Sequence, residues 1–352
     1  YECSALVQFN DSNLPEGLCE SILSQIRLCK VNVAIGWGVG GDYMTEYPPE
    51  AGYPIGGDFE IKYYMIETHF NNPNRISNIN GSSGIRFYLG DQLRQYDIGY
   101  LTFGTDIQPD ALAIPPYAQN FNVDSFCPKS VTMNIPNSGI SIISAFPHAH
   151  LQGRSIWTKI IRNTTAVKYL INAESFNFNY QLQTRFTQPI ILYSGDEFVT
   201  RCVYNTMNKT QVTLGGESVH NEMCLNMFAY YPRMENFSVC LNSILTSSWS
   251  TLMQNNASST FDYGQFMQWL MNIQWTPQIT TQWQAFYKNA SRLIIYGRAE
   301  NLRYNTLYPL LQYKDLEQKQ CNQTSTFNHA AYPVSNISTI LFLMIHLMIL
   351  KI

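Results

Sequence analysis

Two histidines separated by one residue, His148 and His150, are the side chains whose types and spacing most clearly could do chemistry. Residues 140–145 precede the pair and residues 156–161 follow it, and both runs are rich in the β-branched residues that favour strands. Side chains two positions apart on a strand project from the same face. The spacing therefore predicts two imidazoles side by side, as one copper, zinc, iron or nickel ion requires. Without a third ligand, chance or surface placement is the alternative.

A third candidate ligand lies in the sequence His220-Asn221-Glu222-Met223-Cys224. The thioether of Met223 is a soft donor that favours Cu(I), although a methionine by itself is more often a core residue. Cys224 offers a competing thiolate ligand, but adjacent strand residues point to opposite faces. We therefore expect Met223 to face the metal and Cys224 to form a structural disulfide. His220 is interpreted as a loop residue.

These residues need strands to position them, and the sequence predicts many short strands separated by turn signals. This spacing favours an all-β sandwich, because no βαβ alternation and no phosphate-binding glycine motif occurs. Residues 261–273 and 282–295 have apolar spacing closer to that of helices, and residues 1–50 read as irregular. The predicted strands cover residues 59–70, 85–89, 97–103, 131–135, 139–145, 155–161, 190–193, 197–204 and 223–231.

Composition argues against a nucleic-acid partner and favours the secretory pathway. The 352 residues carry a formal net charge of −3 and only 13% charged residues, so no polyanion partner is implied. Eight cysteines and nine Asn-x-Ser/Thr sequons favour a secreted or lumenal glycoprotein, although such short motifs also arise by chance. The acceptor asparagines are Asn10, Asn80, Asn163, Asn208, Asn236, Asn256, Asn289, Asn322 and Asn336.

The two ends of the chain lead to separate expectations. Tyr1-Glu2-Cys3 reads as the interior of a domain, so we expect an amino-terminal portion to precede it. Residues 337–350 are almost entirely apolar and follow small residues, as in a lipid-anchor signal. The run is short for a spanning helix, which needs about 20 residues, and a buried core helix is the other alternative. We expect residues 336–352 to attach the protein to a membrane, at the endoplasmic reticulum or the cell surface.

Three short sequences occur in one order, His148-Ala149-His150-Leu151-Gln152-Gly153-Arg154, then Glu222-Met223-Cys224, then Tyr230-Tyr231-Pro232. In this combination, the chain resembles the copper type II, ascorbate-dependent monooxygenases, and the Tyr-Tyr-Pro ending looks closer to the dopamine β-hydroxylase-like and monooxygenase-X branch. The resemblance runs from about residue 1 to about residue 242.

The resemblance implies two jelly-roll β-sandwich domains, each carrying one copper. Residues 1–96 would be the carboxy-terminal part of the first domain, which is incomplete here, and residues 97–250 the second. Residues 251–335 would form a partly helical extension, followed by the apolar segment 336–352.

The resemblance also assigns the metal ligands. The second-domain copper corresponds to His148, His150 and Met223. His69, in His-x-x-Asn-Pro, corresponds to one ligand of the first-domain copper, whose other ligands are an adjacent His-His pair. The sequence contains no such pair, so we expect one intact copper site and a poorly active chain. Glu222 and Tyr230 are candidates for contacts behind the ligands. The alternatives are a solvated strand residue for Glu222 and a core ring for Tyr230.

The implied reaction inserts one atom of dioxygen into an activated C–H bond of a small-molecule substrate, with ascorbate as electron donor. Met227 occupies a position where the catecholamine and peptide enzymes carry Tyr, so no substrate is assigned. Two alternatives stay open, a catalytically silent, membrane-anchored binding protein and an adhesion module with incidental histidines. Sequence alone leaves the cysteine pairing open. The pairs that the resemblance implies are Cys3–Cys29, Cys127–Cys240 and Cys202–Cys224.

Overall fold

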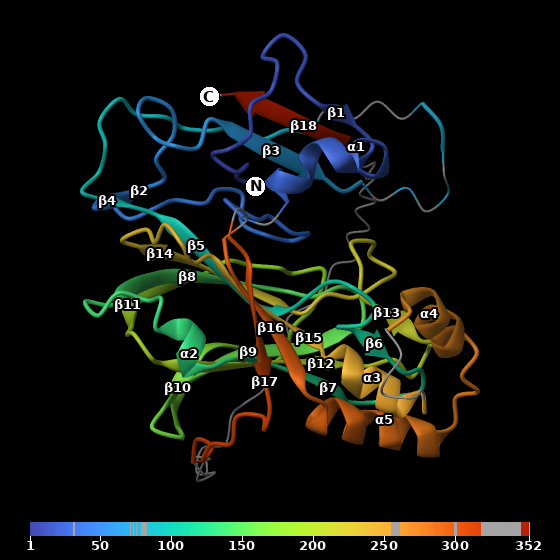
Figure 1. Ribbon diagram of the computed structural model, residues 1–352. Helices are drawn as coiled ribbons and strands as arrows, with labels where there is room; N and C mark the ends of the chain where they lie inside the picture. The colour runs from blue at the N-terminus through green and yellow to red at the C-terminus, as the bar shows by residue number, and fades with distance from the viewer. Residues whose placement is uncertain are drawn as a thin grey trace, which may run out of the picture.

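Two facing β-sheets form the centre of the molecule (Figure 1). This computed structural model describes residues 1–352 except 31, 71, 73, 75, 79–82, 255–260, 299–300, 318–345 and 352. Within that range, one sheet has four strands in the order β10-β9-β12-β7, and the other has seven in the order β11-β8-β14-β5-β15-β16-β17. The strands are β5 (Gly99–Thr105), β7 (Phe121–Cys127), β8 (Ile140–His148), β9 (Gly153–Arg162), β10 (Thr165–Ala173), β11 (Thr184–Leu192), β12 (Glu197–Tyr204), β14 (Leu225–Tyr231), β15 (Val239–Ile244), β16 (Arg292–Gly297) and β17 (Arg303–Leu307).

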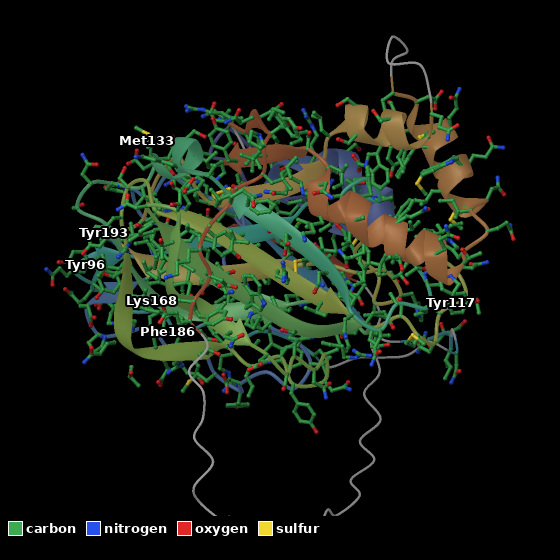
Figure 2. The ribbon with its side chains drawn as sticks, turned by 90° about the horizontal axis from the view of Figure 1, so that it is seen from below. Tyr96, Tyr117, Met133, Lys168, Phe186 and Tyr193 are labelled. Atoms are coloured by element: carbon green, nitrogen blue, oxygen red, sulfur yellow. A yellow bond between two sulfur atoms is a disulfide. The ribbon has the colours of Figure 1, made fainter. Side chains whose placement is uncertain are left out.

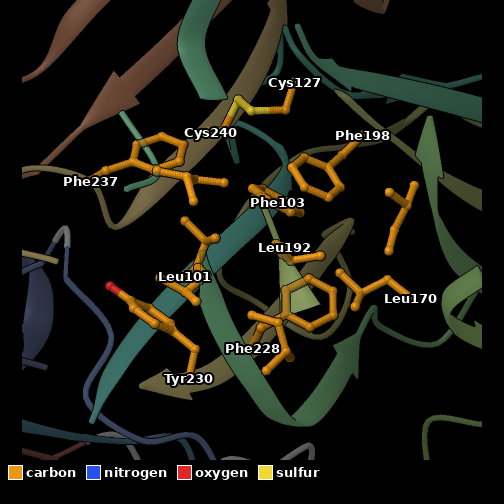
Figure 3. Close-up of a cluster of buried hydrophobic side chains, with 14 of the residues drawn as sticks. Leu101, Phe103, Cys127, Leu170, Leu192, Phe198, Phe228, Tyr230, Phe237 and Cys240 are labelled. Atoms are coloured by element: carbon orange, nitrogen blue, oxygen red, sulfur yellow. A yellow bond between two sulfur atoms is a disulfide. The ribbon is translucent and has the colours of Figure 1, made fainter. Parts of the chain in front are cut away.

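Aromatic and branched side chains fill the space between the two sheets (Figure 3). Phe103 of β5 stacks on Phe198 of β12 with ring centroids 4.6 Å apart, and Phe228 of β14 packs beside Phe103. All three rings are buried, and burying each contributes about 1.5–3 kcal/mol to stability. Because side chains alternate along β14, Met227 lies on its other face, under residues of the amino-terminal layer. The predicted all-β class is confirmed.

Residues 1–95 form a thinner layer over the outer face of the seven-stranded sheet (Figure 1). Its regular elements are β1 (Glu16–Gly17), α1 (Cys19–Ile26), the 3₁₀ helix η1 (Arg27–Cys29), β2 (Ala51–Gly52) and β3 (Tyr63–Thr68). Residues 1–50 were expected to be irregular, which is wrong for α1. Its Ile22 and Ile26, one turn apart, are buried against Met65 of β3, so tertiary packing stabilises a helix of only eight residues.

Three helices cover one side of the sandwich, namely α3 (Thr246–Leu252), α4 (Tyr263–Met271) and α5 (Pro277–Asn289). The Asp262 side chain accepts a hydrogen bond from the Gln265 N–H at the start of α4, and Thr276 caps α5 in the same way. The predicted helix at 261–273 is therefore confirmed. The predicted helix at 282–295 ends early at Asn289, because residues 292–297 pair with β15 as β16.

Two predicted strands are absent. Residues 85–89 have no regular secondary structure and are exposed, since no neighbouring strand pairs with them. Residues 131–135 overlap the short helix α2 (Lys129–Thr132) and the turn after it. Pro128 is the N-cap residue of α2. Met133 points outward from this turn (Figure 2) and is 64% exposed, so the apolar residues there do not form a strand face.

The apolar end of the chain is described only in part. His346–Lys351 forms strand β18, which pairs with β3 and β1. The rest of the segment 336–352 lies outside the described residues. None of the described helices is both long and apolar enough to cross a membrane. Attachment to a membrane stays a prediction.

A buried ionic cluster joins the amino-terminal layer to the sandwich. The Glu2 carboxylate lies 2.7 Å from Arg233, just after β14, and 3.1 Å from Arg298, just after β16. The Tyr53 hydroxyl also donates to Glu2. Glu2 is 3% exposed, so its charge depends on these partners. The cluster therefore fixes the layer over the face on which the histidine pair lies.

Candidate metal centre

The histidine pair lies at the end of β8, where β8 runs beside the start of β14. His148 is paired in register with Leu225, the first residue of β14. The imidazoles of His148 and His150 have ring centroids 5.2 Å apart and planes at 83° to each other. The structure thus brings the two rings side by side, with His148 half-buried and His150 buried.

Each imidazole is held through its Nδ1 atom. His148 Nδ1 lies 2.7 Å from Gln181 Oε1, and His150 Nδ1 lies 3.0 Å from the carbonyl oxygen of Asn221. Both partners are acceptors, so in the neutral rings these contacts favour a proton on Nδ1. Burial lowers the pKa of both histidines, that of His150 to about 3, which favours the neutral form that binds metals.

Glu222 connects the histidine loop to the strand that follows Met223. Its side chain is fully buried, and its two carboxylate oxygens accept hydrogen bonds from the backbone N–H of His150 (2.8 Å) and of Gln152 (2.5 Å). Burial raises the Glu222 pKa to about 7, against the opposing effect of these N–H donors. Glu222 therefore acts as a buried clamp, by which we mean that its carboxylate ties the backbone of residues 150–152 to the segment before β14. The alternative, a solvated strand residue, is wrong.

Met223 follows this clamp directly. Its carbonyl oxygen accepts a 2.7 Å hydrogen bond from the Tyr204 hydroxyl, and its neighbour Cys224 is bonded to Cys202 of β12. The backbone of Met223 is thus fixed on both sides, and its half-buried side chain starts beside the histidine loop. The disulfide removes Cys224 as a thiolate ligand. Coordination by the Met223 sulfur stays a prediction.

His69 approaches the pair from the amino-terminal layer. It lies just after β3, and its Nε2 is 2.8 Å from Glu67 Oε1, which leaves Nδ1 as its other nitrogen. This hydrogen bond raises the His69 pKa. The charge of His69 adds to the lowering of the pKa of His148 and His150, whose main cause is burial.

The donor set decides which metal fits this region. In the described part of the chain, no group of three or more His, Cys, Asp or Glu is arranged to hold a metal ion. Met223, which follows Glu222 in the sequence, carries a thioether, a soft donor of a type outside these four. Two neutral imidazole nitrogens and one thioether suit a copper ion that alternates between Cu(II) and Cu(I).

Comparison with known proteins agrees with this chemistry. The carboxy-terminal domain of the copper type II ascorbate-dependent monooxygenases matches residues 96–257, and their amino-terminal domain matches residues 1–77. The chain belongs to this family. The pair and Met223 lie within the first of these two matched ranges, and His69 lies within the second.

Several relatives in this family are 30–36% identical to the chain. Tyramine beta-hydroxylase of Caenorhabditis briggsae is 36% identical over 217 residues, which are 62% of this chain and 37% of the relative. DBH-like monooxygenase protein 2 of Mus musculus is 33% identical over 278 residues, 76% of this chain and 43% of the relative. Dopamine beta-hydroxylase of Rattus norvegicus is 31% identical over 246 residues, which are 69% of this chain and 38% of the relative. The chain spans about two fifths of the length of these relatives.

The structure contains the three disulfides that the resemblance implied, which confirms Cys3–Cys29, Cys127–Cys240 and Cys202–Cys224. Disulfides persist in oxidising compartments, so they support the secretory pathway. Five sequon asparagines are described, and all are exposed: Asn10, Asn163, Asn208, Asn236 and Asn289. Asn80, Asn256, Asn322 and Asn336 lie outside the described residues. Glycosylation itself stays a prediction.

Tyr230 and His220 are the other two residues that the sequence offered near the site. Tyr230 lies on β14, five residues after Leu225, and is buried between the sheets. Its hydroxyl accepts a hydrogen bond from the Met234 N–H. The Tyr230 ring is thus part of the core, which was the alternative interpretation of this residue. His220 is exposed in a turn, as expected.

Sequence reasoning missed two residues that hold the site. Gln181 fixes His148, and Tyr204 fixes Met223 through its carbonyl. No local sequence pattern indicates either residue, because Gln181 is 33 residues from His148 and Tyr204 is 19 residues from Met223.

Proposed function

We propose that this chain carries the oxygen-activating copper centre of an ascorbate-dependent monooxygenase that hydroxylates an activated C–H bond of a small molecule. The observation that carries the proposal is the pair of adjacent imidazoles, both hydrogen-bonded through Nδ1, next to the Glu222–Met223 segment. Bound copper would supply the redox chemistry between ascorbate, dioxygen and the substrate.

The residues of the chain bind, orient and shield. His148 and His150 would hold copper through Nε2, and Met223 through its sulfur. Phe146 stacks on His148 with centroids 6.1 Å apart, and Phe178 meets the His150 ring edge-on at 6.2 Å. These two rings would help to shield the pair from water. Glu222 keeps the histidine loop at a fixed distance from the start of β14.

His69 would help to hold a second copper, which would supply electron storage. We propose this role because the charge of His69 acts on the pair and its Nε2 is fixed by Glu67. The sequence contains no His-His pair to complete that site. We therefore propose one tightly held copper in this chain, and a requirement for further ligands before steady turnover.

Met227 bears on the substrate. It is 8% exposed on the outer face of β14, against Gly36 and on the side of Phe146. The names of the relatives refer to tyramine and dopamine, and both amines are suitable first substrates for a test. The thioether of Met227 offers no hydroxyl to such a substrate, so we assign no particular one.

The test is a copper titration of the purified chain with three variants. We expect about one copper per chain, and we expect His148→Ala to remove most of it. Met223→Leu keeps the side-chain volume but removes the sulfur, so it should weaken copper binding and leave the unfolding midpoint unchanged. His220→Ala is the matched control, because His220 is exposed in the loop beside the site.

Retention of copper by His148→Ala would contradict the assignment. If the chain with its full set of ligands binds copper but shows no ascorbate-dependent oxygen uptake with either amine, the silent binding protein becomes the better description.

A further inference from the structure

The glycine-rich segment, residues 36–41, packs directly against the connection between β10 and β11. The Gln181 N–H donates to the Val39 carbonyl at 3.0 Å. A Cβ on Gly40, whose φ is +74°, would lie 2.0 Å from the carbonyl oxygen of Asn179. A Cβ on Gly38 would lie 2.8 Å from Cδ of Gln181. Only glycine allows the two backbones to approach this closely.

The Gln181 side chain is held at both ends of its amide. It is 2% exposed, its Nε2 donates to the Phe178 carbonyl at 3.0 Å, and its Oε1 lies 2.7 Å from His148 Nδ1. Because the amide NH₂ is engaged by a carbonyl, the oxygen must face the imidazole. This arrangement selects the His148 tautomer that keeps Nε2 free.

The contact joins two parts of the molecule. The glycine-rich segment lies in the range matched by the amino-terminal family domain, and Gln181 lies in the range matched by the carboxy-terminal one. Residues 174–183 have no regular helix or strand to hold them. A further contact joins the same two parts, because the Thr45 hydroxyl donates a 3.1 Å hydrogen bond to Gln183 Oε1. The position of Gln181 therefore depends on the segment packed against it.

We propose that Gln181 is a positioning residue that couples docking of the glycine-rich segment to the orientation and tautomer of His148. When the amino-terminal layer is in place, Gln181 holds the His148 Nδ1–H and directs Nε2 towards the metal. When the layer moves away, this hold is lost. The inference rests on the proposed function in one respect, namely that His148 is a metal ligand.

The first measurement uses the metal-free full chain with ¹⁵N-labelled histidine. The ¹⁵N shifts of the His148 ring report which nitrogen carries the proton, and His148→Ala identifies its signals among the six histidines. Gln181→Met keeps the length but removes the acceptor oxygen, so it should give a mixture of tautomers. Gln181→Glu restores an oxygen at that position and should restore the Nδ1–H form.

The second measurement tests the coupling. Gly38→Ala should displace Gln181 and reproduce the tautomer mixture of Gln181→Met. Gly90→Ala is the matched control, because its new Cβ meets no atom within 4 Å. In Cu(II) titrations followed by electron paramagnetic resonance, Gln181→Met and Gly38→Ala should both weaken binding by about 10- to 100-fold, as loss of a hydrogen bond behind a ligand usually does.

The outcomes separate the two proposals. An unchanged His148 tautomer in Gln181→Met would overturn the positioning role, and an unchanged tautomer in Gly38→Ala would overturn the coupling. Failure of the unaltered chain to bind copper would instead contradict the proposed function, whatever the tautomer measurement shows.

Discussion

At the scale of single residues, Glu222 shows how a charged side chain is retained in the interior. An isolated buried carboxylate is costly, and it is tolerated when its oxygens are hydrogen-bonded. The two carboxylate oxygens of Glu222 accept hydrogen bonds from the backbone N–H groups of His150 and Gln152. The same two bonds set the spacing between the histidine loop and Met223.

Replacement of Glu222 by Gln should disturb this clamp without changing its volume. One carboxylate oxygen becomes an NH₂ group that faces a backbone donor, so one buried N–H loses its acceptor. We expect a loss of about 1–3 kcal/mol in the free energy of unfolding, measured by urea denaturation, together with weaker copper binding. Glu174→Gln, at an exposed position, should do neither. Wild-type stability and copper binding in Glu222→Gln would show that the clamp is dispensable.

At the scale of elements, β14 is fixed at its start by a disulfide and along its length by two neighbours. Cys224 is bonded to Cys202 of the opposite sheet immediately before Leu225. β8 and β5 flank β14 on its two sides. The disulfide Cys127–Cys240 also joins the sheets, but at β7 and β15, away from the histidine pair.

These two bridges should therefore have separable effects. Removing Cys202–Cys224 with a double alanine variant opens a separation of 22 residues and should cost about 3 kcal/mol, while also releasing Met223 and weakening copper binding. Removing Cys127–Cys240 opens 113 residues and should cost about 5 kcal/mol, with copper affinity retained in the folded fraction. Urea unfolding and copper titration measure the two effects. Equal copper loss in both variants would argue against a local role for the first bridge.

At the scale of the whole molecule, the amino-terminal layer is held on the sandwich by the Glu2 cluster. Burial would raise the pKa of Glu2, but the hydrogen bonds and charges of Arg233, Tyr53 and Arg298 outweigh it and hold the pKa below its usual range. A carboxyl group whose pKa is lower in the folded than in the unfolded protein stabilises the fold above its unfolded pKa, and this contribution is lost as the pH falls through the folded pKa.

Acid should therefore loosen the layer from the sandwich. The contribution of Glu2 is fully present above its unfolded pKa of about 4.5 and declines below it. The protection factors of residues 51–65, which correct hydrogen-exchange rates for their intrinsic pH dependence, should fall between pH 6 and pH 3. Glu2→Gln should exchange faster at pH 6 and show a weaker pH dependence. The same pH dependence in both proteins would place the acid-sensitive contact elsewhere.

The sequence by itself determined the elements and the chemistry they carry. Runs rich in β-branched residues, separated by turn signals, predicted most strands of the sandwich, and 197–204 coincides with β12. The His-x-His spacing, with Met223, predicted the metal pair, and the family resemblance supplied the disulfides. Local patterns failed at α1, α2 and residues 85–89, where packing or its absence outweighed propensity.

Only the tertiary structure decided how the site is held. Gln181 and Asn221 select the free nitrogen of each imidazole from 33 and 71 residues away. The burial of Glu222, the core position of Tyr230 and the approach of His69 likewise depend on which strands and layers meet. Hydrogen-bond partners of this kind are set by strand register and by interlayer contact, and both arise from pairing between residues far apart in the chain, which local spacing does not encode.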